Sequence, residues 1–122
     1  MSMTWNDAKN YCETLKFGNL YNAHLIEIYN STQQNFLTEK IIEIDQNIGY
    51  NIGWWLGLTD SETEGIWKWA NSGNIATYFY WQYGQPDNYW GGSDFVYYNV
   101  ANYGWDDCTY HDYCSTICQL LF

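Results

Sequence analysis

The chain has 122 residues, a formal net charge of −10 and 21% aromatic residues. The acidic excess excludes a nucleic-acid-binding role, which needs a basic surface. No apolar run approaches the ~20 residues that span a bilayer. The length and aromatic content predict a single domain over residues 1–122, with a hydrophobic core of its own.

The first predicted element is a helix that begins near Thr4. A hydroxyl side chain caps unpaired amides at a helix start, and Asp7 favours the positive end of the helix. Gly18 predicts where the helix ends. Its apolar face recurs at helical spacing and comprises Trp5, Ala8, Cys12 and Leu15.

A short strand is predicted over residues 23–28, followed by a second helix. Ser31 and Gln34 have the spacing of a capping box at the start of that helix. A loop over residues 47–53 is expected to follow it. The apolar stripe of the second helix comprises Phe36, Leu37, Ile41 and Ile44.

Beyond residue 54 the helical period disappears. A long irregular segment covers residues 81–92, and such segments inside small domains are usually functional. Two helices followed by a strand-rich half predict an α+β fold. The expected strands cover residues 54–58, 66–69, 95–100 and 114–122.

Oxygen-bearing side chains cluster at two places in this half. Gln85 and Asp87 flank Pro86, which can lock a tight turn through a cis bond. The pair Asp106–Asp107 follows further along the chain. Carboxylate and amide oxygens are the ligands that Ca²⁺ takes, so these residues predict a calcium site.

An aromatic side chain accompanies the predicted calcium site. Trp90 lies in the same loop as Gln85 and Asp87, beside Gly91 and Gly92, which let the loop bend. Metal ligands beside an exposed indole suit a ligand that carries both hydroxyl groups and an apolar face.

These motifs together resemble the C-type lectin domain family over residues 4–122. The motifs that carry the resemblance are Trp55-Leu56-Gly57-Leu58, Gln85-Pro86-Asp87, Trp105-Asp106-Asp107, Thr4 to Ala8 with Cys12, Ala23 to Ile28, and Cys118. The resemblance implies a C-type lectin-like fold, with two helices flanking small antiparallel sheets and a long irregular loop region that binds calcium and sugar.

The resemblance also implies a function, which is calcium-dependent carbohydrate binding without catalysis. In the family the ion coordinates two neighbouring sugar hydroxyls. Members that have Gln before the Pro and Asp after it are selective for galactose or N-acetylgalactosamine. The implied sugar-binding residues are Gln85, Asp87, Trp90 and Asp106. The implied ligands of the principal ion are Gln85, Asp87, Ser93, Asp106 and Asp107.

Two of these positions depart from the family pattern. Ser93 stands where the family usually has a Glu, and Asp106 stands where it usually has an Asn. The number of carboxylates around the ion is retained, but Asp106 cannot donate a hydrogen bond to a hydroxyl. The resemblance further implies an auxiliary calcium ion, for which the alternative reading is a solvated turn. Its side chains would be Asp60, Glu64, Asn88 and Asp94.

Four cysteines allow three pairings, and an even count suits a secreted protein. The resemblance implies a Cys12–Cys118 disulfide, whereas the positions of the family's second bridge, near Phe95 and Tyr110, are not cysteines here. The remaining pair is therefore expected to form a Cys108–Cys114 disulfide. A zinc site that includes His111 is the alternative use of the two thiols.

Three further expectations remain open. Asn30-Ser31-Thr32 is a glycosylation sequon, but a role as a helix cap would account for the same residues equally well. Only residues 1–3 precede the first predicted helix, where the family usually has a strand that pairs with the last one; either that strand is missing from the sequence or the last strand is an exposed edge, which would favour a homodimer. The alternative function is an ice- or protein-binding module on the same fold. An enzyme is not expected, because no nucleophile–His–carboxylate order is evident.

Overall fold

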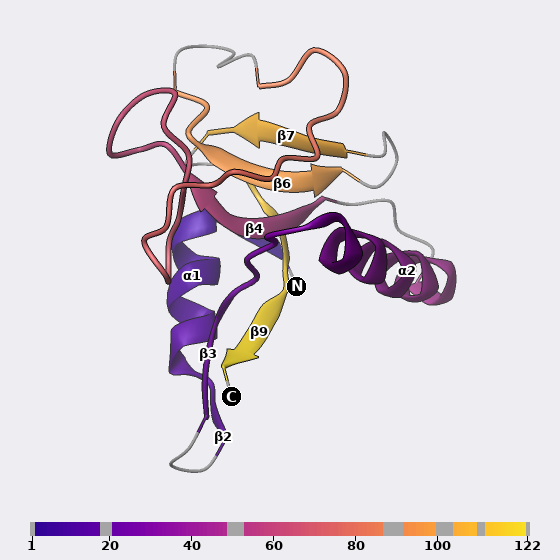
Figure 1. Cartoon of the computed structure of the whole chain (residues 1–122). Coiled ribbons are helices and arrows are strands. Elements are labelled where there is room, and N and C mark those ends of the chain that lie inside the picture. Colours follow the sequence, from indigo (N-terminus) through magenta and orange to yellow (C-terminus); the bar gives the residue numbers. More distant parts are fainter. Residues whose placement is uncertain are drawn as a thin grey trace.

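The computed structural model describes residues 2–17, 21–48, 53–86, 92–99, 104–109 and 112–121. These residues form two helices and two small β-sheets (Figure 1). The α+β prediction is therefore confirmed. The elements are β1 (Ser2–Met3), α1 (Trp5–Thr14), β2 (Lys16–Phe17), β3 (Tyr21–Leu25), α2 (Ser31–Ile48), β4 (Trp54–Thr59), β5 (Lys68–Trp69), β6 (Phe95–Asn99), β7 (Gly104–Cys108), β8 (Cys114–Thr116) and β9 (Cys118–Leu121).

The main sheet has the strand order β1-β8-β4-β6-β7, with β5 paired to β4. The second sheet has the order β2-β3-β9. The predicted last strand is thus divided into β8 and β9, which belong to different sheets. A short strand, β1, does precede the first helix and pairs with β8, so the expectation that this strand has no counterpart is wrong. Within the described part of the chain β9 pairs with β3 alone, and the homodimer stays a prediction.

Helix α1 begins as predicted and ends early. The Thr4 side chain accepts a hydrogen bond from the Asp7 amide at 3.3 Å. The helix ends at Thr14 rather than near Gly18, because Leu15 is extended and leads into β2. Three of the four predicted face residues are buried, namely Trp5, Ala8 and Cys12.

The cap of α2 differs from the predicted capping box by one position. Asn30, not Ser31, is the capping residue: its Oδ1 accepts from the Gln33 amide at 2.9 Å. The Gln33 side chain in turn accepts from the Tyr29 amide at 2.6 Å. This cap uses the side-chain oxygen of Asn30, which is exposed, so the sequon remains sterically compatible with glycosylation at the amide nitrogen.

The buried face of α2 also differs from the predicted stripe. Leu37 and Ile41 are buried as expected, whereas Phe36 is 62% and Ile44 41% exposed. Gln34 is also buried, although its polarity kept it out of the predicted stripe. It is fully buried and accepts a hydrogen bond from the Trp105 indole at 2.8 Å. Because this bond satisfies the amide oxygen, a polar residue can occupy the core and shift the buried face.

Two tryptophans join the sheets to the segments around them. The Trp5 indole donates to the Leu56 carbonyl at 2.7 Å, and the Trp55 indole donates to the Met3 carbonyl at 2.7 Å. At Gly57 an added Cβ would lie 3.0 Å from the Leu25 carbonyl oxygen, so a glycine permits the close approach of β3 to β4. The Trp5 bond thus ties α1 to β4, below which the helix lies in Figure 1.

The Cys12–Cys118 disulfide is present and confirms that prediction. It connects the last turn of α1 to the first residue of β9 across a sequence separation of 106. Cys12 is fully buried, so this covalent bond lies within the core rather than on the surface.

The buried Gln34–Trp105 bond leads to a stability prediction. Replacing Gln34 with Leu keeps a similar volume but leaves the Trp105 indole N–H without this acceptor. The free energy of unfolding should fall by about 1–3 kcal/mol, the cost of an unsatisfied buried donor. Urea denaturation followed by tryptophan fluorescence measures it. The matched control is Asn35→Leu at an exposed position of the same helix, and equal effects at both positions would contradict the assignment.

Candidate functional site

One end of the main sheet gathers acidic residues from three strands. Thr59 of β4, Phe95 of β6 and Cys108 of β7 are aligned across neighbouring strands at this end. Acidic side chains lie directly beside each of these three positions. We call this region the acidic end, and its acids are Asp60, Glu64, Asp94, Asp106 and Asp107.

The backbone at the acidic end is held by hydrogen bonds to and from its acids. The Asp60 amide donates to the Asp94 carbonyl at 3.2 Å, and the Thr59 hydroxyl donates to the same carbonyl at 2.6 Å. The Asp60 carboxylate accepts from the Gly65 amide at 2.9 Å. Gly65 has a φ of +83°, a conformation that favours glycine, and its bond to Asp60 closes the loop that carries Glu64.

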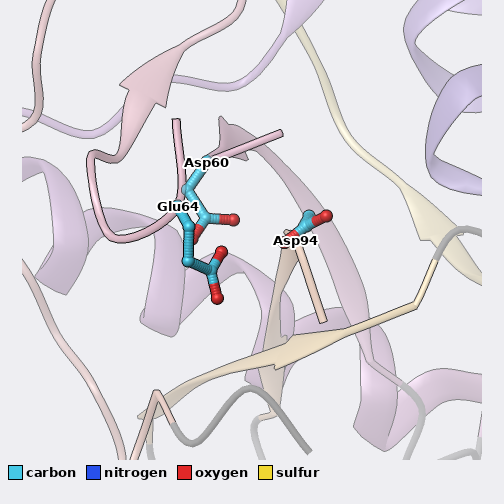
Figure 2. A group of neighbouring side chains, drawn as sticks. All are labelled: Asp60, Glu64 and Asp94. Atoms are coloured by element: carbon cyan, nitrogen blue, oxygen red, sulfur yellow. The ribbon is translucent and has the colours of Figure 1, made fainter. Parts of the chain in front are cut away.

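Asp60, Glu64 and Asp94 form a cluster whose carboxylate oxygens lie within 4.8 Å of one another. Figure 2 shows Asp60 and Glu64 side by side on one segment and Asp94 facing them from another. Asp60 is only 4% exposed, and its Oδ1 is buried with no hydrogen-bond partner among the described residues. Clustered carboxylate oxygens, one of them without a partner, are the kind of ligand that a hard cation takes.

The electrostatics of the cluster point the same way. Burial raises the pKa of Asp60, and the neighbouring Glu64 raises it further. Burial also raises the pKa of Asp94, with Asp60 as the second cause. Both groups are therefore harder to ionise than ordinary carboxyls, and a divalent ion between them would offset that cost.

The second group of predicted ligands lies along β7. The backbone of residues 80–82 pairs with Trp105: the Trp105 amide donates to the Tyr80 carbonyl at 2.7 Å, and the Gln82 amide donates to the Trp105 carbonyl at 3.0 Å. The bridge between Trp81 and Trp105 is parallel, so the chain runs from here toward the acidic end. This pairing brings the segment that carries Gln85 beside the strand that carries Asp107.

The pairing of these two segments depends on a glycine. An added Cβ at Gly104 would lie 2.5 Å from the Cα and the amide nitrogen of Gln82, which is closer than real Cβ atoms approach. Further along, the Gln85 amide donates to the Gln82 carbonyl at 3.0 Å, and the Gln85–Pro86 peptide bond is cis. The predicted cis bond is thus present in the structure.

Asp106 and Asp107 point to opposite faces of β7, because successive side chains alternate along a regular strand. The Asp106 carboxylate accepts a hydrogen bond from the Tyr97 hydroxyl at 3.1 Å. Burial and the nearby Asp106 raise the pKa of Tyr97, so this hydroxyl stays protonated and continues to donate. Asp107 is buried on the other face. The structure therefore does not bring both acids onto one face.

Some predicted site residues lie outside the described residues. These are Asp87, Asn88, Trp90 and His111, and their roles stay predictions. Ser93 is described and buried, directly before Asp94. Among the described residues, the Asp60–Glu64–Asp94 cluster is the one group of three or more acids, histidines or cysteines close enough to share a metal ion.

The expected Cys108–Cys114 disulfide is not formed in the structure. Both residues are free cysteines. The interaction with Cys114 and burial raise the pKa of the Cys108 thiol. The predicted bridge is thus absent, and the zinc alternative involves His111, which lies outside the described residues.

Sequence reasoning missed two residues that position the site. Tyr97 holds Asp106, and Gln34 holds the indole of Trp105, the residue before Asp106. The alternation of β6 would place Tyr97 on the same face as Phe95, but its partner could be found only once the unpredicted strand β7 was paired with β6. The signal for Gln34 was a polar residue at the spacing of Leu37 and Ile41.

Comparison with known proteins gives a consistent family assignment. The family model described as "Lectin C-type domain" matches residues 1–120. The chain is 27% identical to a perlucin-like protein of Mytilus galloprovincialis over 84% of this chain and 60% of that protein. It is 37% identical to human C-type lectin domain family 10 member A over 73% of this chain and 23% of that protein. The chain thus spans less than two thirds of the length of either relative.

A solved structure extends the similarity to the whole fold. The C-type lectin CEL-I from Cucumaria echinata matches with a TM-score of 0.88 and 25% sequence identity. The match covers 100% of this chain and 86% of that one. Separately, within the described residues neither helix combines the length and the apolar character that a bilayer crossing requires.

Proposed function

Because the chain belongs to the C-type lectin domain family, we propose that it binds galactose- or N-acetylgalactosamine-type sugars through calcium. The observation that carries the proposal is the Asp60–Glu64–Asp94 cluster with its buried, unpartnered Asp60 oxygen. A cluster of this composition suits Ca²⁺, which prefers carboxylate oxygens and tolerates irregular geometry. This cluster is the proposed auxiliary ion site, with Asn88 as its fourth side chain.

The principal ion is proposed to lie where the Gln85 segment runs beside β7. We propose Asp107 as its first ligand, because Asp107 alternates to the face of β7 opposite to the Asp106–Tyr97 hydrogen bond. Gln85, Asp87 and Ser93 complete the proposed set, together with Asp106 if its side chain turns away from Tyr97. The ion would leave coordination positions for two neighbouring sugar hydroxyls, and Trp90 would pack on the apolar face of the sugar.

The proposed preference for galactose-type sugars rests on the order of Gln85 and Asp87 around Pro86. An amide donates and a carboxylate accepts hydrogen bonds. This order therefore determines which sugar hydroxyl is hydrogen-bonded to which side chain. A shallow site that buries little sugar surface should give only about millimolar affinity for a single sugar. Useful binding to a glycan-bearing surface would then come from several sites acting together. The Cys12–Cys118 disulfide supports the further proposal that the protein is secreted.

Isothermal titration tests this function directly. Galactose and N-acetylgalactosamine should bind in the presence of Ca²⁺, mannose should bind more weakly, and EDTA should abolish binding of all three. Sugar binding that persists in EDTA would overturn the calcium mechanism. Calcium binding without any sugar binding would instead favour a non-lectin module on the same fold.

A matched pair of variants separates the two adjacent acids. We expect Asp107→Asn to lower the calcium affinity at the principal site more than Asp106→Asn, because the Asp106 carboxylate is engaged by Tyr97 on the opposite face. Loss of a ligating carboxylate should weaken binding by about tenfold or more, by analogy with metal sites in general. Calcium titrations of both variants measure this difference, and an equal loss would show that both acids hold the ion.

A further inference from the structure

A polar cavity of about 510 Å³ lies between α1 and the segment that follows β4. One wall comes from α1, where Asn6, Lys9 and Asn10 share a helical face at spacings of three and four residues. A second wall comes from the loop after β4, which includes Glu62, and from Lys68 of β5. The volume falls within the range of small-molecule sites. The cavity is separate from the proposed calcium sites, because none of its described lining residues is a proposed ligand of either ion.

The cavity concentrates positive charge in a strongly acidic protein. The chain has four basic residues and a net charge of −10, yet two of the four, Lys9 and Lys68, line this cavity. Lys9 pairs with Glu13 at 2.8 Å and Lys68 with Glu62 at 2.9 Å. Both ion pairs are partly exposed and therefore weak, so the ammonium groups remain available to a ligand.

The charges of the lining indicate how much negative charge a ligand should carry. Glu62 lines the cavity, whereas Glu13 does not. The described lining thus carries two ammonium groups and one carboxylate, a net charge of +1. A lining of this kind suits a ligand with a single negative charge rather than a polyanion, which the acidic remainder of the protein would repel.

The buried side of the cavity is lined by aromatic rings that hold its shape. Trp5, Trp69 and Phe95 are 4%, 1% and 8% exposed. The Trp5 indole donates to the Leu56 carbonyl at 2.7 Å, and the centroids of the Trp5 and Phe95 rings lie 4.8 Å apart. The cavity is therefore preformed, which lowers the cost of binding. Because these three rings present no open face, they offer no platform on which a nucleobase could stack.

The polar side chains of the lining match hydroxyl groups. Asn6 and Asn10 are exposed and each carries an amide group that both donates and accepts hydrogen bonds. Ser61 adds a hydroxyl to the same lining. A ring with several hydroxyls and one acidic substituent would use these groups as well as the lysines. An inorganic anion alone would leave most of the volume unfilled.

We propose that this cavity binds an acidic sugar unit, namely a saccharide that carries one carboxylate or one sulfate. Lys9 and Lys68 would pair with the acidic group, and Asn6 and Asn10 would bind the ring hydroxyls. This site is additional to the proposed calcium-dependent site and does not rest on it, since its contacts require no ion.

Nuclear magnetic resonance titration of the ¹⁵N-labelled full chain in EDTA tests the proposal. The probes are glucuronate, glucose 6-sulfate, neutral glucose and inorganic sulfate. Both acidic sugars should shift the side-chain amide signals of Asn6 and Asn10 and the indole signal of Trp5, with a Kd of about 1 mM. Glucose and inorganic sulfate should each bind at least roughly fivefold more weakly, because each lacks half of the contacts. Equal binding of glucose would refute the role of the charge, and equal binding of sulfate would refute the role of the sugar.

Charge variants locate the site. Lys9→Gln and Lys68→Gln should each raise the Kd for both acidic sugars by roughly three- to tenfold, because each removes one charged contact at a partly exposed position. Lys40→Gln is the matched control: it removes the same charge from α2, outside the lining, and should leave the Kd unchanged. An equal loss in all three variants would reveal a general charge effect and overturn the site.

A blocking variant tests the cavity without removing a lysine. Asn10→Trp places a large side chain at an exposed position of α1 that lines the cavity, so it should abolish the shift of the Trp5 indole signal. Undiminished binding of either acidic sugar in this variant would overturn the proposal.

The same titrations in calcium separate this site from the proposed function. Binding of acidic sugars in EDTA, together with binding of galactose only in calcium, supports both. Binding of acidic sugars without any binding of galactose would refute the proposed function and retain the cavity site. Binding of galactose in calcium without binding of acidic sugars in EDTA would overturn the cavity site alone.

Discussion

Removal of calcium is expected to lower the melting temperature of this protein, and replacement of Asp94 with Asn is expected to abolish that difference. The reason is the Asp60–Glu64–Asp94 cluster, in which burial and mutual contact raise the pKa of both Asp60 and Asp94. A ligand that binds only the folded state stabilises it by about 2.7 kcal/mol at 100 times its Kd. For a domain of this size that corresponds to roughly 10 °C.

The same variant should have the opposite effect without calcium. In EDTA the three carboxylates crowd one another, so Asp94→Asn should raise the melting temperature relative to the wild type by a few degrees, roughly the effect of 1 kcal/mol. Differential scanning calorimetry with calcium and with EDTA measures the change in melting temperature under both conditions. Glu62→Gln is the matched control, because Glu62 lies in the same loop but pairs with Lys68 at 2.9 Å, outside the cluster. A calcium effect that survives in Asp94→Asn would refute the site.

The pH dependence of the calcium-free protein provides an independent check. A carboxyl whose pKa is raised on folding binds its proton more tightly in the folded state. Its stabilising contribution is therefore complete below the ordinary pKa of 3.8 and is lost as pH rises through the raised value. The advantage of Asp94→Asn in EDTA should accordingly shrink as the pH is lowered toward 4. With calcium present the dependence reverses, because the ion needs deprotonated ligands.

Loss of the Cys12–Cys118 disulfide should be the most destabilising change that leaves the acidic end untouched. The bond closes a loop with a sequence separation of 106. Closing a loop of that length restricts the unfolded chain, and removing the bond should cost about 4 kcal/mol. The Cys12→Ala/Cys118→Ala variant should therefore melt roughly 10–20 °C below the wild type. Alanine is chosen because Cys12 is fully buried and a serine would add an unsatisfied hydroxyl.

The control for this variant removes two other cysteines from the same chain. Cys108→Ser/Cys114→Ser retains the α1–β9 connection and should melt close to the wild type, since Cys108 and Cys114 are not joined in the structure. Thermal unfolding followed by circular dichroism compares the two variants. If the Cys12–Cys118 variant lost less than about 1 kcal/mol, the unfolded chain would have to be restricted already by other means.

Elements with strong local signals were predictable from the sequence. The start of α1 is encoded by Thr4 and Asp7, and the apolar run at residues 54–58 corresponds closely to β4. Strand β7 was not predicted, because Gly and Asp are poor strand formers. Its backbone is fixed by β6 on one side and by residues 80–82 on the other, and pairing of this kind is not readable from local sequence.

The candidate site was predictable only in part, for a related reason. The family resemblance placed Asp60, Glu64 and Asp94 in one group, and the structure brings these three together. The resemblance could not show that the side chains of Asp106 and Asp107 point to opposite faces, because that follows from the regular alternation along β7, which was not predicted. The shifted face of α2 has a similar origin, since the burial of Gln34 depends on a partner 71 positions away in the chain.

The aromatic surroundings of Trp105 give this protein an optical reporter of its own. The rings of Trp69, Tyr78 and Trp81 each lie with their centroids 6.0 Å from that of Trp105, in steeply tilted orientations, and the ring of Phe79 lies 6.5 Å away. Transition dipoles held so close couple strongly and give intense near-ultraviolet ellipticity. Since Trp105 directly precedes the paired acids of β7, occupancy of the ion site should be visible in that spectrum without any added dye.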